Sequence, residues 1–299
     1  MRVAAVVLAL VVLSLGCSAA PAPGFDSVDG GGASDRPPPA MDVTSAGPDV
    51  RGFDIPPLDV AHLDAAPRID NVRVYAHTAV ALFVVDPLLL SVTPVGAFGW
   101  PADGQDHQMT DIAVTADEHL WGVTFNALYQ IDRATAQCTF VASLSGSLIG
   151  LNFNGLTFVP AGVLGSQEVL VASTQAGAYY LVDTRTGNAN RLGSYGDGIG
   201  SSGDLVAVAG AGMYATVTRG GAEYLARIDP RTGVATVVGP TGVSGTWGLG
   251  YWRARIYGFT NTGSFVTIDI ATGRATVVST SSQSWWGAGV TTIAPTAPP

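Results

Sequence analysis

The chain has 299 residues, of which 47% are hydrophobic, only 12% are charged and 38 are glycine. Its apolar content excludes a disordered protein, and its many glycines disfavour a helical one. The formal charge of −9 disfavours nucleic acid and anionic lipid headgroups as partners.

Residues 1–17 have the features of an export signal: Arg2 is followed by an apolar run that is short for a permanent membrane span. The run ends in Ser14-Leu15-Gly16-Cys17, which resembles the bacterial lipobox. The resemblance implies lipidation of Cys17, a membrane partner held through that lipid, and a place in the bacterial cell envelope outside the cytoplasm. The alternative is an ordinary secretory signal that contains a cysteine.

Residues 18–69 are rich in Pro, Gly and Asp and show no apolar periodicity, so we expect a disordered linker. Cys138 is the one remaining cysteine, which excludes an internal disulfide after removal or lipidation of Cys17. Its neighbours are typical of a strand, and we expect a buried, inert thiol.

The sequence then repeats a unit of β-rich runs separated by turns. An Asp precedes the last turn of each unit, at Asp86, Asp132, Asp183, Asp229 and Asp269, so the spacing is 40 to 51 residues. Asp accepts hydrogen bonds from turn amides and Gly supplies positive φ, as in Asp-x-x-Thr-Gly. We interpret these five residues as hairpin locks; calcium binding or catalysis is the minor alternative.

A second strand precedes the hairpin in all five units, and a first strand precedes that in four of them. We expect second strands at 72–78, 119–124, 168–174, 212–218 and 255–260, and first strands rich in small residues at 111–114, 155–159, 204–209 and 248–251. The first unit lacks a first strand, and residues 286–293 supply a matching one at the other end of the chain. The sequence therefore predicts an all-β, five-bladed β-propeller over 70–295, with its ring closed by the C-terminal strand.

The hairpins Ile228-Asp229-Pro230-Arg231-Thr232-Gly233 and Ile268-Asp269-Ile270-Ala271-Thr272-Gly273 resemble those of exported bacterial propellers of the quinoprotein-like and lactonase-like kind. Quinone-binding members have Trp after the Gly turn, whereas this chain has Val or Thr, so we expect no cofactor. The blade count is similar to that of certain arabinan-cleaving glycosidases and sugar-binding lectins.

Propeller ligands bind where loops converge on the channel mouth. The connections from each fourth strand to the next first strand share one face, and they and the strand starts carry our candidate ligand-binding residues: Asp106, His107, Asp111, Asn154, Asp204, Trp247 and Trp286. Trp285 is expected at the same rim, and no Glu is expected there. His107 with Asp103 and Asp106 is a weak metal signal, so we assign no metal.

Two functions fit these residues. A non-catalytic binding or scaffold module for a glycan or an extracytoplasmic protein needs only stacking surfaces and hydrogen-bonding groups. A polysaccharide hydrolase needs two carboxyl groups flanking the bond, and Asp111 and Asp204 could face each other across the channel. We favour the binding module, expect no catalytic residue, and interpret His77 and His119 as structural residues of second strands. Residues 198–203 spell a dinucleotide fingerprint, but a strand follows, so we expect a loop.

Overall fold

The computed structural model describes residues 73–102, 105–144 and 153–298. The predicted signal 1–17, Cys17 and the predicted linker 18–69 lie outside these residues. The described part of the chain contains no helix with the length and apolar character of a membrane span.

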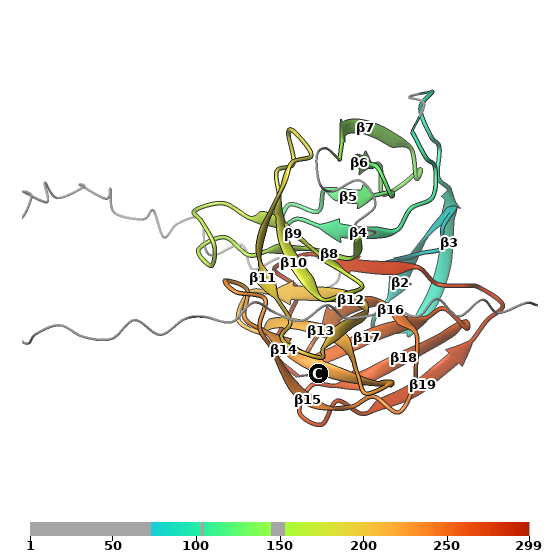
Figure 1. Ribbon diagram of the computed structural model, residues 1–299. Coiled ribbons are helices and arrows are strands. Elements are labelled where there is room, and N and C mark those ends of the chain that lie inside the picture. The colour runs from blue at the N-terminus through green and yellow to red at the C-terminus, as the bar shows by residue number, and fades with distance from the viewer. Residues whose placement is uncertain (1–72, 103–104, 145–152, 299) are drawn as a thin grey trace, which may run out of the picture. The chain divides into compact units, whose positions relative to one another are not determined.

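The described residues form five antiparallel sheets of four strands each, arranged in a ring (Figure 1). From the axis outward, the first blade contains β20 (Gly287–Val290), β1 (Val74–His77), β2 (Ala81–Asp86) and β3 (Ser91–Ala97). The second contains β4 (Asp111–Val114), β5 (Leu120–Val123), β6 (Ala127–Ile131) and β7 (Cys138–Ser143). The third contains β8 (Phe153–Val159), β9 (Val169–Thr174), β10 (Ala178–Val182) and β11 (Ala189–Ser194).

The fourth blade contains β12 (Gly200–Val208), β13 (Gly212–Arg219), β14 (Ala222–Ile228) and β15 (Ala235–Pro240), and the fifth contains β16 (Thr246–Trp252), β17 (Arg255–Thr260), β18 (Ser264–Asp269) and β19 (Ala275–Thr280). The innermost strands β20, β4, β8, β12 and β16 each contact the next one around the ring. The predicted five-bladed propeller is confirmed.

The last strand closes the ring. β20 pairs antiparallel with β1, placing Val290 opposite Val74 and Gly287 opposite His77. The Trp286 amide also donates to the carbonyl oxygen of His77 at 2.8 Å. Because Trp286 lies at one end of this pair and Val74 at the other, the chain enters the propeller on the face opposite Trp286.

The inner strands are crowded, which explains their small residues. A Cβ at Gly203 would lie 2.2 Å from the carbonyl oxygen of Thr246, and one at Gly248 would lie 2.6 Å from the carbonyl carbon of Gly287. Such distances lie far inside van der Waals contact, so any side chain would push the inner strands apart.

The five Asp residues lock the hairpins as predicted. In each blade the carboxylate accepts from the backbone amide two residues on, at 2.8 to 3.0 Å. The residue four places after each Asp has positive φ, and it is Gly in three blades, Ala136 in the second and Leu90 in the first. The locks recur on five separate hairpins and do not gather at one site.

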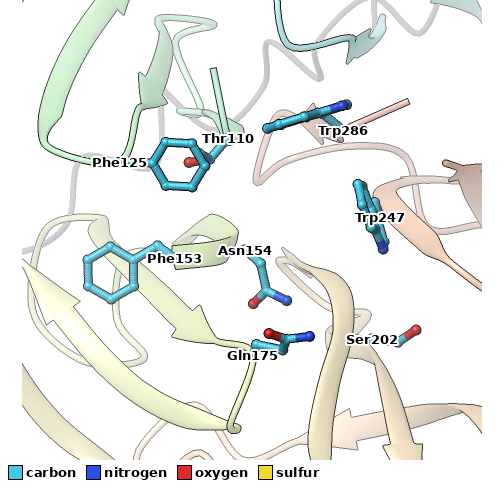
Figure 2. Close-up of a pocket in the computed structure, with 8 residues that line it drawn as sticks. All are labelled: Thr110, Phe125, Phe153, Asn154, Gln175, Ser202, Trp247 and Trp286. Carbon is cyan, nitrogen blue, oxygen red and sulfur yellow. The ribbon is translucent and has the colours of Figure 1, made fainter. Parts of the chain in front are cut away.

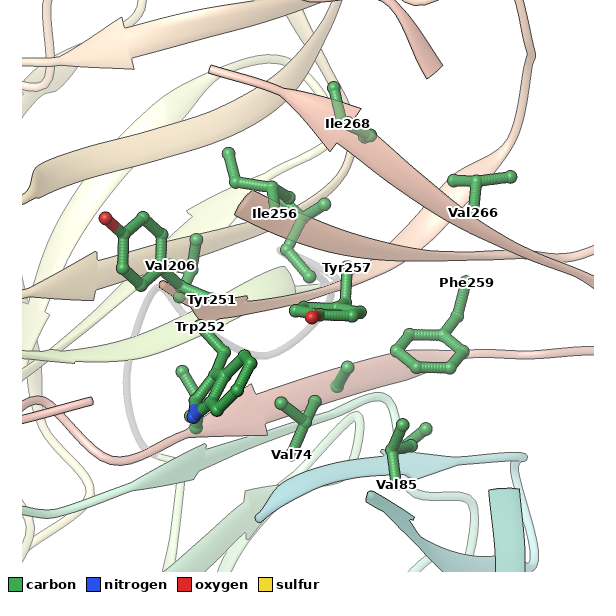
Figure 3. Packing of buried hydrophobic residues seen from close by; sticks show 14 of the residues in the cluster. Val74, Val85, Val206, Tyr251, Trp252, Ile256, Tyr257, Phe259, Val266 and Ile268 are labelled. Atoms are coloured by element: carbon green, nitrogen blue, oxygen red, sulfur yellow. The ribbon is translucent and has the colours of Figure 1, made fainter. Parts of the chain in front are cut away.

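The hydrophobic core lies between neighbouring blades. The largest cluster joins the fifth blade to the first, where Tyr251, Trp252 and Phe259 pack near Val74 and Val85 (Figure 3). Trp285 belongs to this cluster and its ring packs edge-on against Phe83 and Phe259. The expectation that Trp285 forms part of the rim is therefore wrong, because its ring fills the space between two blades.

Three other local predictions are settled by the structure. Cys138 is buried at the start of β7, as expected, and its Sγ lies 3.8 Å from the Ala136 carbonyl oxygen. Residues 200–203 belong to β12, and Gly200 and Ser201 pair with β13 before a register shift, so only the first part of the predicted loop 198–203 is a loop. His119 is not in a second strand: it precedes β5, is exposed, and its Nδ1 lies 3.0 Å from Asp117 Oδ1.

Candidate functional site: the channel mouth and the axial carboxyl pair

A cavity of about 260 Å³ opens where the inner strands begin. Thr110, Asn154, Ser202, Trp247 and Trp286 come from the start of the five inner strands or just before it, one from each blade. The hairpins between second and third strands add Phe125 and Gln175, and Phe153 completes the described lining. The mouth thus lies on the face that the sequence predicts, opposite the face where the chain enters.

The described lining combines aromatic rings with uncharged polar groups. Figure 2 shows Trp247 and Trp286 on one side of the cavity, Phe125 and Phe153 on the other, and Asn154 and Gln175 between them. The two indole rings are perpendicular, with centroids 6.1 Å apart, and both are half-buried. None of these eight residues is charged, so this lining offers stacking and neutral hydrogen bonding.

Asp111 and Asp204 lie below this mouth and are fully buried. Inner strands have a partner on one side only, so their axial amides need other acceptors. Asp111 Oδ1 accepts from the Ile112 amide at 2.8 Å, and Asp204 Oδ1 and Oδ2 accept from the Leu205 and Leu249 amides at 2.5 and 2.6 Å. Asp204 thereby joins the inner strands β12 and β16 of two blades, whereas Asp111 binds a backbone amide of its own strand β4.

The environment keeps protons on this pair. Burial, and then the charge of Asp204, raise the pKa of Asp111 well above its usual value. Burial raises the pKa of Asp204 to about 8, although a hydrogen bond with Asp111, and then the backbone amides of Leu249, Leu205 and Leu156, act in the opposite direction. Two adjacent buried carboxyl groups cannot both ionise cheaply, so the pair holds at least one proton at neutral pH.

Several fully buried polar atoms around the pair have no partner among the described residues: His77 Nε2, Asp111 Oδ2, Ser173 Oγ and Tyr195 OH. His77 Nε2 lies 3.8 Å from Asp111 Oδ1. Burial lowers the pKa of His77 to about 4, so the imidazole is neutral at neutral pH. His77 is structural, as predicted, but one of its nitrogens lacks the partner that a structural histidine usually has.

Glu223 lies behind the mouth and is not among the eight lining residues. Glu223 is buried and accepts hydrogen bonds from the hydroxyls of Ser202 and Thr246 and from the Thr246 amide. Because Ser202 lines the cavity, Glu223 fixes part of the wall. Its oxygens are occupied by these donors and by the Thr241 hydroxyl, which makes it a positioning residue.

Asp106 and His107 are not among the eight lining residues. Asp106 accepts from the backbone amides of Phe125 and Asn126 at 3.4 and 3.1 Å, so it holds the hairpin that presents Phe125. His107 is exposed and stacks on Trp100 with centroids 4.9 Å apart. Asp103 lies outside the described residues, and those described contain no group of three His, Cys, Asp or Glu side chains suited to a metal ion.

Phe125 and Gln175 are lining residues that the sequence analysis missed. Both lie at the turn between the second and third strands of their blades, which meets the mouth because these turns share its face. The signal was available: Phe125 follows Thr124, and Gln175 follows Thr174, at the end of the predicted second strands.

Neither a protein-family model nor a curated protein matches this sequence. Solved structures with a similar fold include one from a nidogen/laminin complex, at 11% identity over 73% of this chain and 98% of that one, with a TM-score of 0.49. TolB from Acinetobacter baumannii matches at 19% identity, 74% and 56% coverage and a TM-score of 0.41. An auxiliary nutrient binding protein from Bacteroides thetaiotaomicron matches at 15% identity over 69% of this chain and 53% of that one, with a TM-score of 0.41. This chain spans about half the length of the latter two, and similarity at this level carries no conclusion about activity.

Proposed function

We propose that this protein is a lipid-anchored binding module of the bacterial cell envelope, and that its channel mouth binds an uncharged glycan without cleaving it. The observation that carries the proposal is the described lining: four aromatic rings and four neutral hydrogen-bonding side chains around one cavity. Aromatic faces stack on the apolar faces of sugar rings, and amide and hydroxyl groups recognise their hydroxyls.

Asn154 gives this binding a direction. Its Oδ1 is buried without a hydrogen-bond partner among the described residues, although its side chain lines the cavity. An unpaired buried acceptor is costly, and a ligand hydroxyl would satisfy it. Asn154 therefore favours ligands that can donate a hydrogen bond to its Oδ1.

Hydrolysis receives no comparable support. Catalysis needs two carboxyl groups in contact with the glycosidic bond. Asp111 and Asp204 are fully buried below the mouth and accept backbone hydrogen bonds, and Glu223 is engaged by four donors. The geometry thus assigns these carboxyl groups to holding strands and the cavity wall.

The placement of the mouth suits a tethered receptor. The chain enters the propeller at Val74, and the mouth opens at the opposite face, beside Trp286. A lipid on Cys17 would attach the chain to the membrane through the segment that enters at the Val74 face. Growth in labelled palmitate tests this anchor: we expect label on the wild-type chain and none on Cys17→Ser.

The glycan proposal is tested by applying the purified full chain to an array of neutral and acidic oligosaccharides. We expect binding to neutral glycans, and a loss of about tenfold or more in affinity for Phe125→Ala or Trp247→Ala. Phe140→Ala is the matched control, because Phe140 is 36% exposed on β7 and Phe125 is 37% exposed at the mouth. Equal binding by all variants, or release of new reducing ends, would overturn the proposal.

A further inference from the structure

The hairpin of the first blade differs from its four equivalents. Those four carry Arg in or directly after the turn, at Arg133, Arg185, Arg231 and Arg274, whereas the first has Leu88, Leu89 and Leu90. These leucines are 60%, 76% and 36% exposed. We call residues 88–90 the leucine tip.

The backbone of the leucine tip adopts a strained conformation at Leu90. Leu90 has φ of 53°, at the position where three of the other hairpins have Gly. A bulky residue in the left-handed region is uncommon and costs of the order of 1 kcal/mol. The hairpin of the first blade therefore differs from the other four in two ways: it exposes apolar side chains, and its backbone is strained at a bulky residue.

The base of this hairpin is firmly held. Asp86 Oδ1 accepts from the Leu88 and Leu89 amides at 2.9 and 3.1 Å, and Pro87 is buried. The hydroxyl of Tyr257 in the neighbouring blade donates to the Pro87 carbonyl at 3.3 Å. The three apolar side chains are thus presented on a fixed, convex support.

We propose that the leucine tip inserts into the interfacial region of a lipid bilayer. The tip lies on the face where the chain enters, because the turns between third and fourth strands share the end of the blades occupied by Val74 and Val290. On the same face Arg231 and Arg274 are exposed and can contact headgroup oxygens, whereas Arg133 pairs with Glu118 and Arg185 lies 3.8 Å from Asp183. A short convex apolar loop suits a fluid bilayer, whereas a stable protein partner requires about 800 Å² on each side.

This inference goes beyond the glycan proposal and does not depend on it. It does not depend on net charge either, because burial of apolar side chains provides the attraction. Acyl chains on Cys17 would attach the chain to the membrane but would not orient the propeller, whereas a membrane contact made by the propeller would orient it. The leucine tip would supply such a contact from the propeller itself.

The test places a polarity-sensitive fluorophore on Leu89→Cys in the full chain, with Val277→Cys as the control. Val277 is 54% exposed on the outer strand β19, and the native Cys138 is buried. After reconstitution into vesicles of phosphatidylethanolamine and phosphatidylcholine, we expect a blue shift and quenching by lipid-borne quenchers at position 89 only. We also expect amide exchange of residues 86–91 to slow by about tenfold, and Leu88→Ser/Leu89→Ser to abolish this.

A position-89 probe that stays water-exposed in a vesicle-bound chain would overturn the proposal. A blue shift that grows with protein concentration in the absence of vesicles would also overturn it, since it would identify a second copy of the chain as the occupant. Glycan binding by the double serine variant, measured in parallel, separates failure of this proposal from failure of the mouth.

Discussion

The protonated axial pair predicts an unusual dependence of stability on pH. The pKa of Asp204 is raised from 3.8 to about 8, so the native state holds a proton that the unfolded state has released. A state that binds more protons is favoured at lower pH. The contribution of the pair is therefore complete below pH 3.8 and is lost as the pH rises through about 8.

His77 opposes this below its usual pKa. Its pKa falls from 6.5 to about 4, so between these values the unfolded state binds a proton that the native state lacks. His77 has no such effect between pH 6.5 and about 8, so the contribution of the carboxyl pair is best measured in this window. Each extra native proton lowers the free energy of unfolding by about 1.4 kcal/mol per pH unit, so a pair that holds at least one proton loses at least about 2 kcal/mol across that window.

Urea unfolding followed by tryptophan fluorescence at the two ends of the window measures this difference. We expect Asp204→Asn to flatten the slope, whereas Asp197→Asn, which changes an exposed carboxylate, leaves it unchanged. Replacing His77 with Gln extends the fall in stability toward pH 4. If Asp204→Asn and the wild type lose stability in parallel between pH 6.5 and 8, the reasoning about a buried shared proton is refuted.

Three further substitutions or deletions test the packing of the ring. Gly248→Ala should lower stability by about 1 to 3 kcal/mol in thermal unfolding, because its Cβ would overlap the Gly287 backbone. Gly165→Ala is the control and should be near neutral, since its Cβ would meet nothing closer than 3.9 Å. Equal effects of the two substitutions would contradict the crowding argument. Asp132→Ala removes two hydrogen bonds of 2.9 Å on an exposed hairpin and should cost about 1 kcal/mol; no loss in urea unfolding would show that the lock is dispensable. Deleting residues 286–299 removes β20 and leaves the axial edge of β1 unpaired, so we expect a lower melting temperature and aggregation. An unchanged melting curve would argue against closure.

The fold was predictable because each blade repeats one local rule. Asp at the turn and a positive-φ residue four places later mark the hairpin, and even Ala136 and Leu90 adopt that conformation without glycine. The spare strand after Trp285 then had only one vacancy to fill. Strand bounds such as Arg255–Thr260 and Asp111–Val114 follow from alternation and small residues alone.

The site was less predictable, since it depends on side-chain direction. Trp285 and Trp286 are neighbours in sequence, yet one ring packs between blades and the other lines the mouth, because successive residues of an extended chain point to opposite sides. The proximity of Asp111 and Asp204 was expected, but their burial was not. The burial of these two side chains depends on how closely the five inner strands converge at the axis. This distance is set by the packing of all five blades and cannot be predicted from one segment of the sequence.

Hydrogen exchange of β1 and β20, followed by mass spectrometry on the intact chain, tests the closed ring most directly. Every assignment to the mouth depends on these two strands being paired. The closed ring predicts that amides of Val74–His77 and Gly287–Val290 exchange as slowly as those of the central strands β8 and β9. Exchange of β1 and β20 as fast as residues 296–298 would contradict it, because an unpaired edge opens without unfolding the rest.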